Sequence, residues 1–187
     1  MFLYHYLRNP KATGAIMQSS KYLAQIITQN INLESADNII ELGPGMGAFT
    51  KIILEKKKES ARFFVVEINP KLARKLAHKL SNIDIALGSA QNLGEMMSAR
   101  GMERADVIIS GIPFAFLGAR EQSIILKNVH SALKDGGYFS TFTYHTSLLT
   151  PFSRTFKRAL HRTFSRVETS KSILLNIPPA FVYVCRK

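Results

Sequence analysis

The stretch from Asn38 to Gly47, NIIELGPGMG, constrains the fold of this chain more than any other. It opens with a short apolar run that is typical of a buried strand. Glycines follow at positions 43, 45 and 47, and an apolar run with helical spacing extends from Ala48 to Leu54. A strand, a glycine turn and a helix in this order predict a nucleotide-binding βα unit, because glycine lets the backbone approach a ligand closely.

Details of this turn distinguish between nucleotide ligands. With Ala48 in third place, the turn fits the dinucleotide pattern G-x-G-x-x-A. Glu41, however, stands two residues before Gly43, where its carboxylate can accept a cationic amino group, and Gly47 is a third glycine at a spacing of two. We therefore predict that Glu41, Gly43, Gly45 and Gly47 bind S-adenosylmethionine (SAM). The pattern Glu-x-Gly-x-Gly-x-Gly resembles the first motif of the class I SAM-dependent methyltransferases.

A second acidic residue ends the next apolar run, FFVVE, which we predict to be a strand over Phe63–Glu67. Glu67 follows the glycine turn at close to the spacing at which an acid meets the ribose hydroxyls of a nucleotide. Asn69 and Pro70 then predict the start of a basic helix that extends to about Leu80, with Asn as the N-cap and Pro in the first turn. We predict that Glu67 binds the ribose of the cofactor.

Further strands are predicted over residues 83–87, 105–110 and 138–144, with a helix from about Gly118 to Leu133 that ends in a glycine C-cap at 135–137. Strands that alternate with helices predict an α/β fold with a parallel sheet covered on both faces. Ligands of such sheets bind at the carboxyl ends of the strands. The residues predicted at these ends are Glu41, Glu67, Ser89, Ser110 and Tyr144.

The composition of the chain indicates the class of molecule to which it binds. The formal net charge of +12 and a pI of about 10 favour a polyanionic partner, either nucleic acid or anionic lipid. Charge alone does not choose between the two. The chain has a single cysteine, Cys185, and no apolar stretch of about 18 residues that would span a membrane. These features predict a soluble, cytoplasmic chain of one domain, residues 1–187.

Two segments carry aromatic and basic residues together. We predict a helical extension over residues 1–30, in which Phe2 and Tyr4 lie either at a membrane interface or against the domain itself. Within it, Ser19 or Ser20 is predicted to cap a helix that extends to about Asn30. Residues 151–171 predict a basic amphipathic segment whose aromatic stripe faces either a membrane or the edge of the sheet. The last residues, 173–187, predict an antiparallel pair divided by a Pro-Pro turn.

Motifs along nearly the whole chain resemble the bacterial phospholipid N-methyltransferases, a family within the class I SAM-dependent methyltransferases. These motifs are Arg8-Asn9-Pro10, Thr13-Gly14-Ala15, Ser19-Ser20, Glu41 to Gly47, Glu67 to Pro70, Ser110 to Pro113, Phe142-Thr143-Tyr144 and Asn176 to Ala180. The resemblance implies a Rossmann-like, mainly parallel seven-stranded sheet with an N-terminal helical extension. It also implies transfer of methyl groups from SAM to phosphatidylethanolamine toward phosphatidylcholine, with S-adenosylhomocysteine as the product.

The predicted site follows from the motifs and the resemblance together. Beyond Glu41, Gly43, Gly45, Gly47 and Glu67, the predicted cofactor contacts are Ser89, Ala90, Ser110 and Gly111. The predicted substrate or membrane contacts are Ile112, Pro113, Phe2, Tyr4, Lys157, Arg158 and Arg162, and Tyr144 is predicted to orient the amine or the lipid phosphate. We expect a monomer without metal or DNA, bound peripherally at the inner face of the cell membrane.

Two alternatives remain at this point. The first is adenine N6-methylation of ribosomal RNA (rRNA), since that family carries a similar loop, Asn-Ile-Pro-Phe or Asn-Leu-Pro-Tyr, after a strand. This chain has Gly111-Ile112-Pro113-Phe114 there, so it lacks the Asn side chain that accepts from the adenine amine. The second is a non-catalytic lipid- or RNA-binding module that retains the fold.

Overall fold

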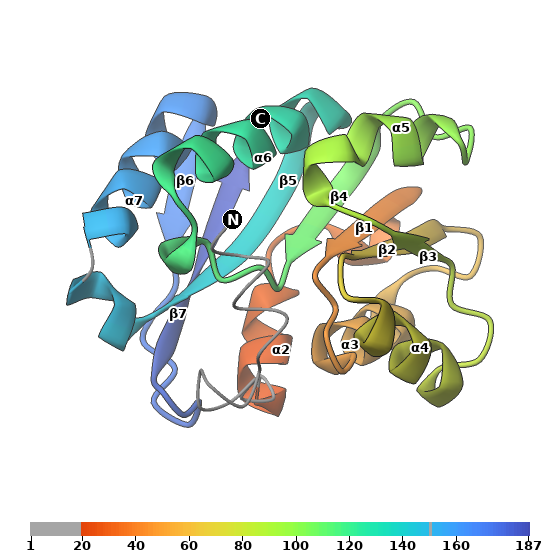
Figure 1. Cartoon of the computed structure of the whole chain (residues 1–187), viewed down its shortest axis with the longest axis horizontal. Coiled ribbons are helices and arrows are strands. Elements are labelled where there is room, and N and C mark those ends of the chain that lie inside the picture. Colours follow the sequence, from red (N-terminus) through yellow and green to blue (C-terminus); the bar gives the residue numbers. More distant parts are fainter. Residues whose placement is uncertain (1–19, 150) are drawn as a thin grey trace.

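A seven-stranded sheet runs through the chain, whose computed structural model describes residues 20–149 and 151–187. Its strands are β1 (Asn38–Leu42), β2 (Arg62–Glu67), β3 (Ile85–Leu87), β4 (Ala105–Ser110), β5 (Leu133–Tyr144), β6 (Arg166–Thr169) and β7 (Ala180–Arg186). Their order is β3-β2-β1-β4-β5-β7-β6 (Figure 1). The first five strands in this order are parallel, and β7 is antiparallel to both β5 and β6. The predicted fold class is therefore confirmed.

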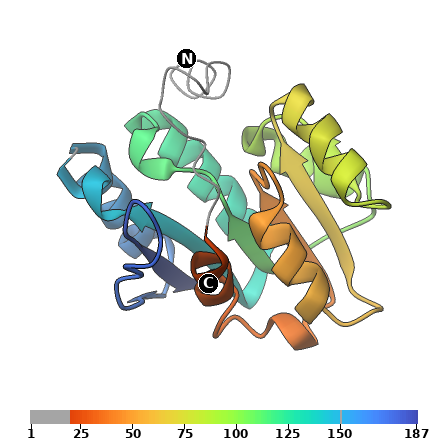
Figure 2. The ribbon, with the colours of Figure 1, turned by 90° about the horizontal axis from the view of Figure 1, so that it is seen from below.

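Helices cover both faces of this sheet, as predicted. In Figure 1, α5 and α6 lie above the strands, and α2, α3 and α4 lie below them; Figure 2 views the molecule from the side of α2 and α3. The α-helices are α2 (Lys21–Ile27), α3 (Ala48–Lys56), α4 (Pro70–Lys79), α5 (Leu93–Ser98), α6 (Ala119–Ala132) and α7 (Pro151–Thr163). The 3-10 helices are η1 (Leu33–Ser35), η2 (Ala90–Asn92), η3 (Phe114–Phe116) and η4 (His145–Leu149).

Each face of the sheet has its own hydrophobic core. Buried residues of α2 and α3 pack with one side of β1, β4, β5 and β7, whereas those of α5, α6 and α7 pack with the other side. Because residues alternate along a strand, even-numbered positions of β5 such as Phe142 face α2 and α3, and odd-numbered positions such as Phe139 face α6 and α7. The site residues of β5 can be assigned to faces in the same way.

The predicted helix starts are confirmed where side chains cap the backbone. The hydroxyl of Ser20 accepts from the N–H of Leu23 at the start of α2, and the side chain of Asn69 accepts from the N–H of Lys71 at the start of α4. The end of α2 was predicted too late, since the helix ends at Ile27 and the backbone at Asn30 is left-handed.

The predicted glycine C-cap after α6 is wrong. The helix ends at Ala132, and Leu133 already pairs with Ala105 in the sheet. The register shifts between this pair and the next, so residues 134–137 form an irregularity within β5, where Gly136 has a φ of +75°. A Cβ at Gly137 would approach the carbonyl oxygen of Asp106 to 3.0 Å. Gly136 and Gly137 therefore form part of the bulge in β5 and do not cap α6.

The C-terminal region also differs from the prediction. Residues 173–177 do not form a strand, and Ile173 joins Ala180 only through an isolated bridge. The antiparallel partners of β7 are β5 and β6. Likewise, the basic segment predicted over 151–171 divides into α7 and β6, because its helical spacing ends at Phe164 and an alternating strand follows.

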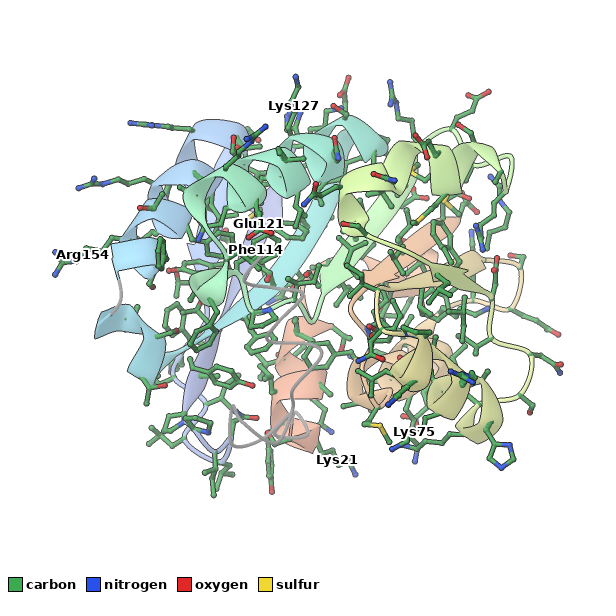
Figure 3. The ribbon with its side chains drawn as sticks, in the orientation of Figure 1. Lys21, Lys75, Phe114, Glu121, Lys127 and Arg154 are labelled. Atoms are coloured by element: carbon green, nitrogen blue, oxygen red, sulfur yellow. The ribbon has the colours of Figure 1, made fainter. Side chains whose placement is uncertain are left out.

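The apolar stripe of α7 packs on the sheet. Phe156 and Leu160 are buried, as is Phe164 just beyond the helix, and the ring of Phe156 stacks on that of Phe114 with centroids 4.5 Å apart. The stripe was predicted to face either a membrane or the edge of the sheet, and these three residues pack against the sheet. Phe152, one turn earlier, is 44% exposed. Arg154 points away from the molecule and Phe114 lies inside it (Figure 3).

Replacing Phe156 with Ala should lower the free energy of unfolding by about 3–5 kcal/mol, because it removes a buried aromatic ring and leaves a cavity. Phe152→Ala is the matched control on the same helix and should cost much less, since its ring is already exposed. Thermal unfolding followed by circular dichroism measures both. Equal and small changes would show that the stripe of α7 does not pack on the sheet.

Candidate active site

The loop between β1 and α3 follows a path that only glycine adopts easily. Gly43, Gly45 and Gly47 have φ values of +68°, +55° and +84°, in the left-handed region that L-residues avoid. The N–H of Gly43 donates to the carbonyl of Val66 at 2.8 Å, so the loop begins bonded to β2. Gly47 ends it as the N-cap residue of α3. The predicted strand, turn and helix are therefore present.

The surroundings of these glycines differ. A Cβ at Gly47 would lie 2.7 Å from Cδ1 of Leu76 in α4, so this glycine allows α4 to pack against the loop. A Cβ at Gly45 would meet nothing within 4 Å. The loop is thus open at Gly45, where a ligand can approach the backbone. This geometry fits the predicted approach of SAM.

The carboxylate of Glu67 supports the open part of the loop. Its Oε2 accepts from the N–H of Gly45 at 3.2 Å, and its Oε1 accepts from the N–H of Asn69 at 2.8 Å. Burial raises the pKa of Glu67, and the N–H donors of Asn69 and Gly45 oppose that rise. A carboxylate has about four acceptor sites, so two donors leave capacity for ribose hydroxyls. The predicted ribose contact is compatible with this geometry and stays a prediction.

Glu41 lies deeper than Glu67 and has no exposed surface. Its Oε2 accepts from the hydroxyl of Thr50 at 2.7 Å, whereas Oε1 is buried without a partner among the described residues. Burial raises the pKa of Glu41 to about 8; the Thr50 hydroxyl opposes this rise and the nearby Glu67 adds to it. A buried oxygen without a donor fits the predicted cationic amino group, and that contact too stays a prediction.

The loop after β4 lies against the glycine loop. The N–H of Gly111 donates to the carbonyl of Leu42 at 2.8 Å, and a Cβ at Gly111 would come within 2.4 Å of the Gly43 carbonyl oxygen. The buried hydroxyl of Ser110 accepts from the N–H of Ile112 at 3.1 Å, which fixes this turn. The predicted contact Ile112 is buried against the glycine loop, since a Cβ at Gly43 would lie 3.0 Å from its Cγ1, and the predicted contact Pro113 is half-buried.

The loop after β3 completes the cofactor side of the site. The N–H of Gly88 donates to the carbonyl of Glu67 at 2.9 Å, so the loop begins beside β2. The hydroxyl of Ser89 accepts from the N–H of Gln91 and caps η2, in which Ala90 is buried. The structure thus brings together the predicted cofactor residues of four strand ends.

Strand β5 extends beyond its neighbour β4 and carries the substrate candidate Tyr144. The last residue of β4, Ser110, pairs with Thr141, so Tyr144 lies three residues further along. The half-buried ring of Tyr144 lies edge-on to that of Phe142, with ring centroids 5.1 Å apart, on the face toward α2 and α3. Its predicted role in orienting the amine stays a prediction.

Sequence reasoning missed a polar row on the other face of this extension. Thr141 and Thr143 are buried, and neither hydroxyl has a hydrogen-bond partner among the described residues. The same holds for Nε2 of His145, whose ring contacts Phe181 at 5.3 Å. Polar residues at 141, 143 and 145 that alternate with the aromatic residues at 142 and 144 are the signal that could have identified this row.

The predicted membrane contacts form two groups. Phe2 and Tyr4 fall outside the described residues. Lys157, Arg158 and Arg162 are exposed on the outer side of α7, together with Arg154 and His161. Among the residues that the structure describes, no group of three or more His, Cys, Asp or Glu side chains could hold a metal ion.

Replacing Gly45 with Val should abolish SAM binding, because the added side chain would occupy the open side of the loop. Gly101 offers a matched control, since its φ is +60° and its Cβ would also meet nothing within 4 Å. Both variants should lose at least about 1 kcal/mol of stability from a left-handed L-residue. Calorimetric titration should show that Gly101→Val alone binds SAM. Normal binding by Gly45→Val would place the cofactor elsewhere.

Replacing Glu41 with Gln should change the pH dependence of stability. The folded chain keeps a proton on Glu41 up to about pH 8, whereas the unfolded chain releases it near 4.5. The stability that Glu41 contributes is therefore fully present below 4.5 and is lost as the pH rises through about 8. Because Gln does not ionise, the variant should melt at a higher temperature than the unmodified chain above about pH 8 and at a similar one below about pH 5.

The same variant should bind SAM less tightly, by about tenfold or more, because Gln offers the amino group no negative charge. Calorimetry near pH 8 measures this difference. If Glu41→Gln binds SAM with unchanged affinity, the cofactor amino group is held by another residue.

Comparison with known proteins relates this chain to methyltransferases. The family model described as "Ribosomal RNA adenine dimethylase" matches residues 7–92. An ornithine lipid N-methyltransferase from Singulisphaera acidiphila is 29% identical over all of this chain and 94% of its own length. A ribosomal RNA small subunit methyltransferase A from Hydrogenobaculum sp. is 27% identical over 58% of this chain, which spans only 40% of that relative.

Solved structures share the fold over the full chain. The N-methyltransferase NodS from Bradyrhizobium japonicum in complex with S-adenosylhomocysteine has a TM-score of 0.70 at 15% identity and covers 100% of this chain and 99% of its own. An O-methyltransferase from Bacillus cereus in complex with the same product has a TM-score of 0.73 at 14% identity and covers 100% and 90%. The predictions of an enzyme and of SAM as its cofactor are confirmed: the chain is a SAM-dependent methyltransferase with the class I fold.

Proposed function

We propose that this enzyme methylates the amino nitrogen of a membrane-lipid headgroup, with phosphatidylethanolamine as the substrate and phosphatidylcholine as the end product. The observation that carries the proposal is that two sequence similarities cover different portions of the chain. The rRNA adenine dimethylase model ends at residue 92 and three bacterial rRNA methyltransferases align over 58–64% of the chain, whereas the similarity to the ornithine lipid N-methyltransferase covers all of it, including β5 to β7. The part of the chain that continues past the cofactor loops therefore resembles the lipid enzyme.

The end of β5 supplies the groups for an amine acceptor. Bound SAM would supply a methyl group already activated on a sulfonium. Free lysine-like amines titrate near 10, and an amine attacks only when neutral, so the site must favour loss of a proton. Burial among apolar side chains favours the neutral amine. Tyr144 would orient the headgroup, and His145, with an unpartnered Nε2 among the described residues, would accept the proton as a general base.

The rRNA alternative has a specific observation in its favour, namely the family match over residues 7–92. The loop after β4 argues against it. The rRNA enzymes carry Asn where this chain has Gly111, and here a side chain has no room, because its Cβ would lie 2.4 Å from the Gly43 carbonyl oxygen. The three bacterial rRNA methyltransferases align with 58–64% of this chain, which spans 40–44% of their length.

We further propose that the enzyme is a single-domain monomer that binds the inner face of the cell membrane peripherally. The net charge of +12 supports an anionic surface as the partner. The outer side of α7 presents four cationic side chains, Arg154, Lys157, Arg158 and Arg162, together with His161. Within residues 20–149 and 151–187, no helix has the length and hydropathy needed to cross a bilayer.

Incubation with methyl-labelled SAM tests the substrate directly. Vesicles of phosphatidylethanolamine, vesicles of ornithine lipid and ribosomal RNA are offered separately, with the Gly45→Val variant as a blank. We expect label in phosphatidylethanolamine. Label in ornithine lipid alone would show that the proposed headgroup is wrong and that the substrate is nevertheless a membrane lipid. Label in RNA alone would contradict the proposal.

A further inference from the structure

The loop between β6 and β7 exposes an unusual group of aliphatic side chains. Leu174, Leu175 and Ile177 are 73%, 66% and 73% exposed, the largest values among the large hydrophobic residues that the structure describes. We call residues 173–179 the apolar loop. Figure 1 shows this loop at the lower end of β7, beside α2. Three adjacent aliphatic side chains in water are unfavourable unless something covers them.

Buried anchors hold these side chains outward. Ile173 is buried, and its N–H donates to the Ala180 carbonyl at 2.7 Å. Asn176 is 2% exposed; its Oδ1 accepts from the N–H of Ser20 at 2.9 Å, and its Nδ2 donates to the Pro178 carbonyl at 2.7 Å. The anchors alternate with the exposed residues, so the loop is fastened to the start of α2 and to β7.

The apolar loop also borders the proposed substrate site. The N–H of His145 donates to the carbonyl of Pro179 at 2.8 Å, and Ala180 pairs with Tyr144 across the sheet. Leu148 in η4 and Phe152 at the start of α7 are 40% and 44% exposed, which extends the apolar surface around the end of β5. A surface that covered this loop would therefore lie next to the acceptor site.

The charges around the loop indicate what covers it. Residues 136–187 contain one acid, Glu168. Two exposed lysines flank the loop: Lys171 lies two residues before Ile173, and Lys21 follows Ser20, whose N–H bonds Asn176. Arg166 and Arg186 lie at the opposite end of β7. Exposed aliphatic side chains flanked by lysines complement an anionic phospholipid surface, whose headgroups attract the cations and whose acyl region accommodates the aliphatic groups.

We propose that the apolar loop inserts into the outer acyl region of an anionic phospholipid bilayer and positions the end of β5 over the headgroups. This inference rests on the proposed lipid substrate and adds the surface through which the enzyme reaches it. Basic residues of α7 would supply the part of membrane affinity that salt screens. Leu174, Leu175 and Ile177 would supply a part that salt does not screen.

A single tryptophan can report insertion, because the chain contains none. Leu174→Trp places it on the apolar loop, and Leu54→Trp, at a 39% exposed position of α3, is the matched control. Vesicles of phosphatidylcholine and phosphatidylglycerol with brominated acyl chains should shift the emission of Leu174→Trp to shorter wavelengths and quench it, and should leave Leu54→Trp unchanged. Vesicle binding without shift or quenching of Leu174→Trp would overturn the proposal.

The Leu174→Ser, Leu175→Ser double variant separates docking from chemistry. Its partition onto the same vesicles should fall by about tenfold or more at high salt, and Leu54→Ser should partition like the unmodified chain. Methyl transfer to detergent-solubilised phosphatidylethanolamine should be unchanged, because neither leucine belongs to the active site. If the double variant remains active and partitions onto vesicles like the unmodified chain, the docking proposal is refuted and the proposed function is not. Loop-dependent partition without methylation of any amino-lipid would refute the proposed function alone.

Discussion

The buried carboxylate of Glu67 holds together the two loops that we predict to bind the cofactor. One oxygen bonds the N–H of Gly45 and the other bonds the N–H of Asn69, so the end of β2 fixes the turn that follows β1. Within the described residues, neither Glu67 nor the deeper Glu41 has an ion pair, and burial raises the pKa of both. Two buried carboxyl groups without a cation favour a positively charged ligand, so they would let a chain with a net charge of +12 bind cationic SAM at the predicted site.

The cofactor half of the site could be predicted from the sequence because its signals are local. The strand ending at Leu42, the glycine at position 45 and the acid at Glu67 each follow from neighbouring residues, as does the Asn69 cap with Pro70 behind it. Glycine in left-handed turns and Asn before Pro depend little on tertiary contacts. The burial of Glu41 could not be predicted in this way, because it depends on how α3 packs over β1 through Thr50.

The missed features depend on long-range contacts. Gly136 and Gly137 resemble a helix C-cap in sequence, yet pairing of Leu133 with Ala105 makes them part of a bulged strand. The apolar run around Leu174 resembles a strand but pairs only at its first residue, so its side chains are exposed. The polar row that ends at His145 alternates in the sequence, but its position beyond the end of β4 follows only from the pairing of the strands. Pairing partners decide all of these cases, and local propensity does not encode them.

The central claim is that one carboxyl edge of the sheet holds SAM at Glu67 and an amino-lipid at the end of β5. A crystal structure with S-adenosylhomocysteine and a short-chain phosphatidylethanolamine bound tests it most directly. The account predicts that the ribose hydroxyls of the product bond Glu67 and that the lipid amine lies between the product sulfur and the Tyr144–His145 end of β5. A headgroup bound on α7, away from the sulfur, or a ribose that makes no contact with Glu67 would contradict it.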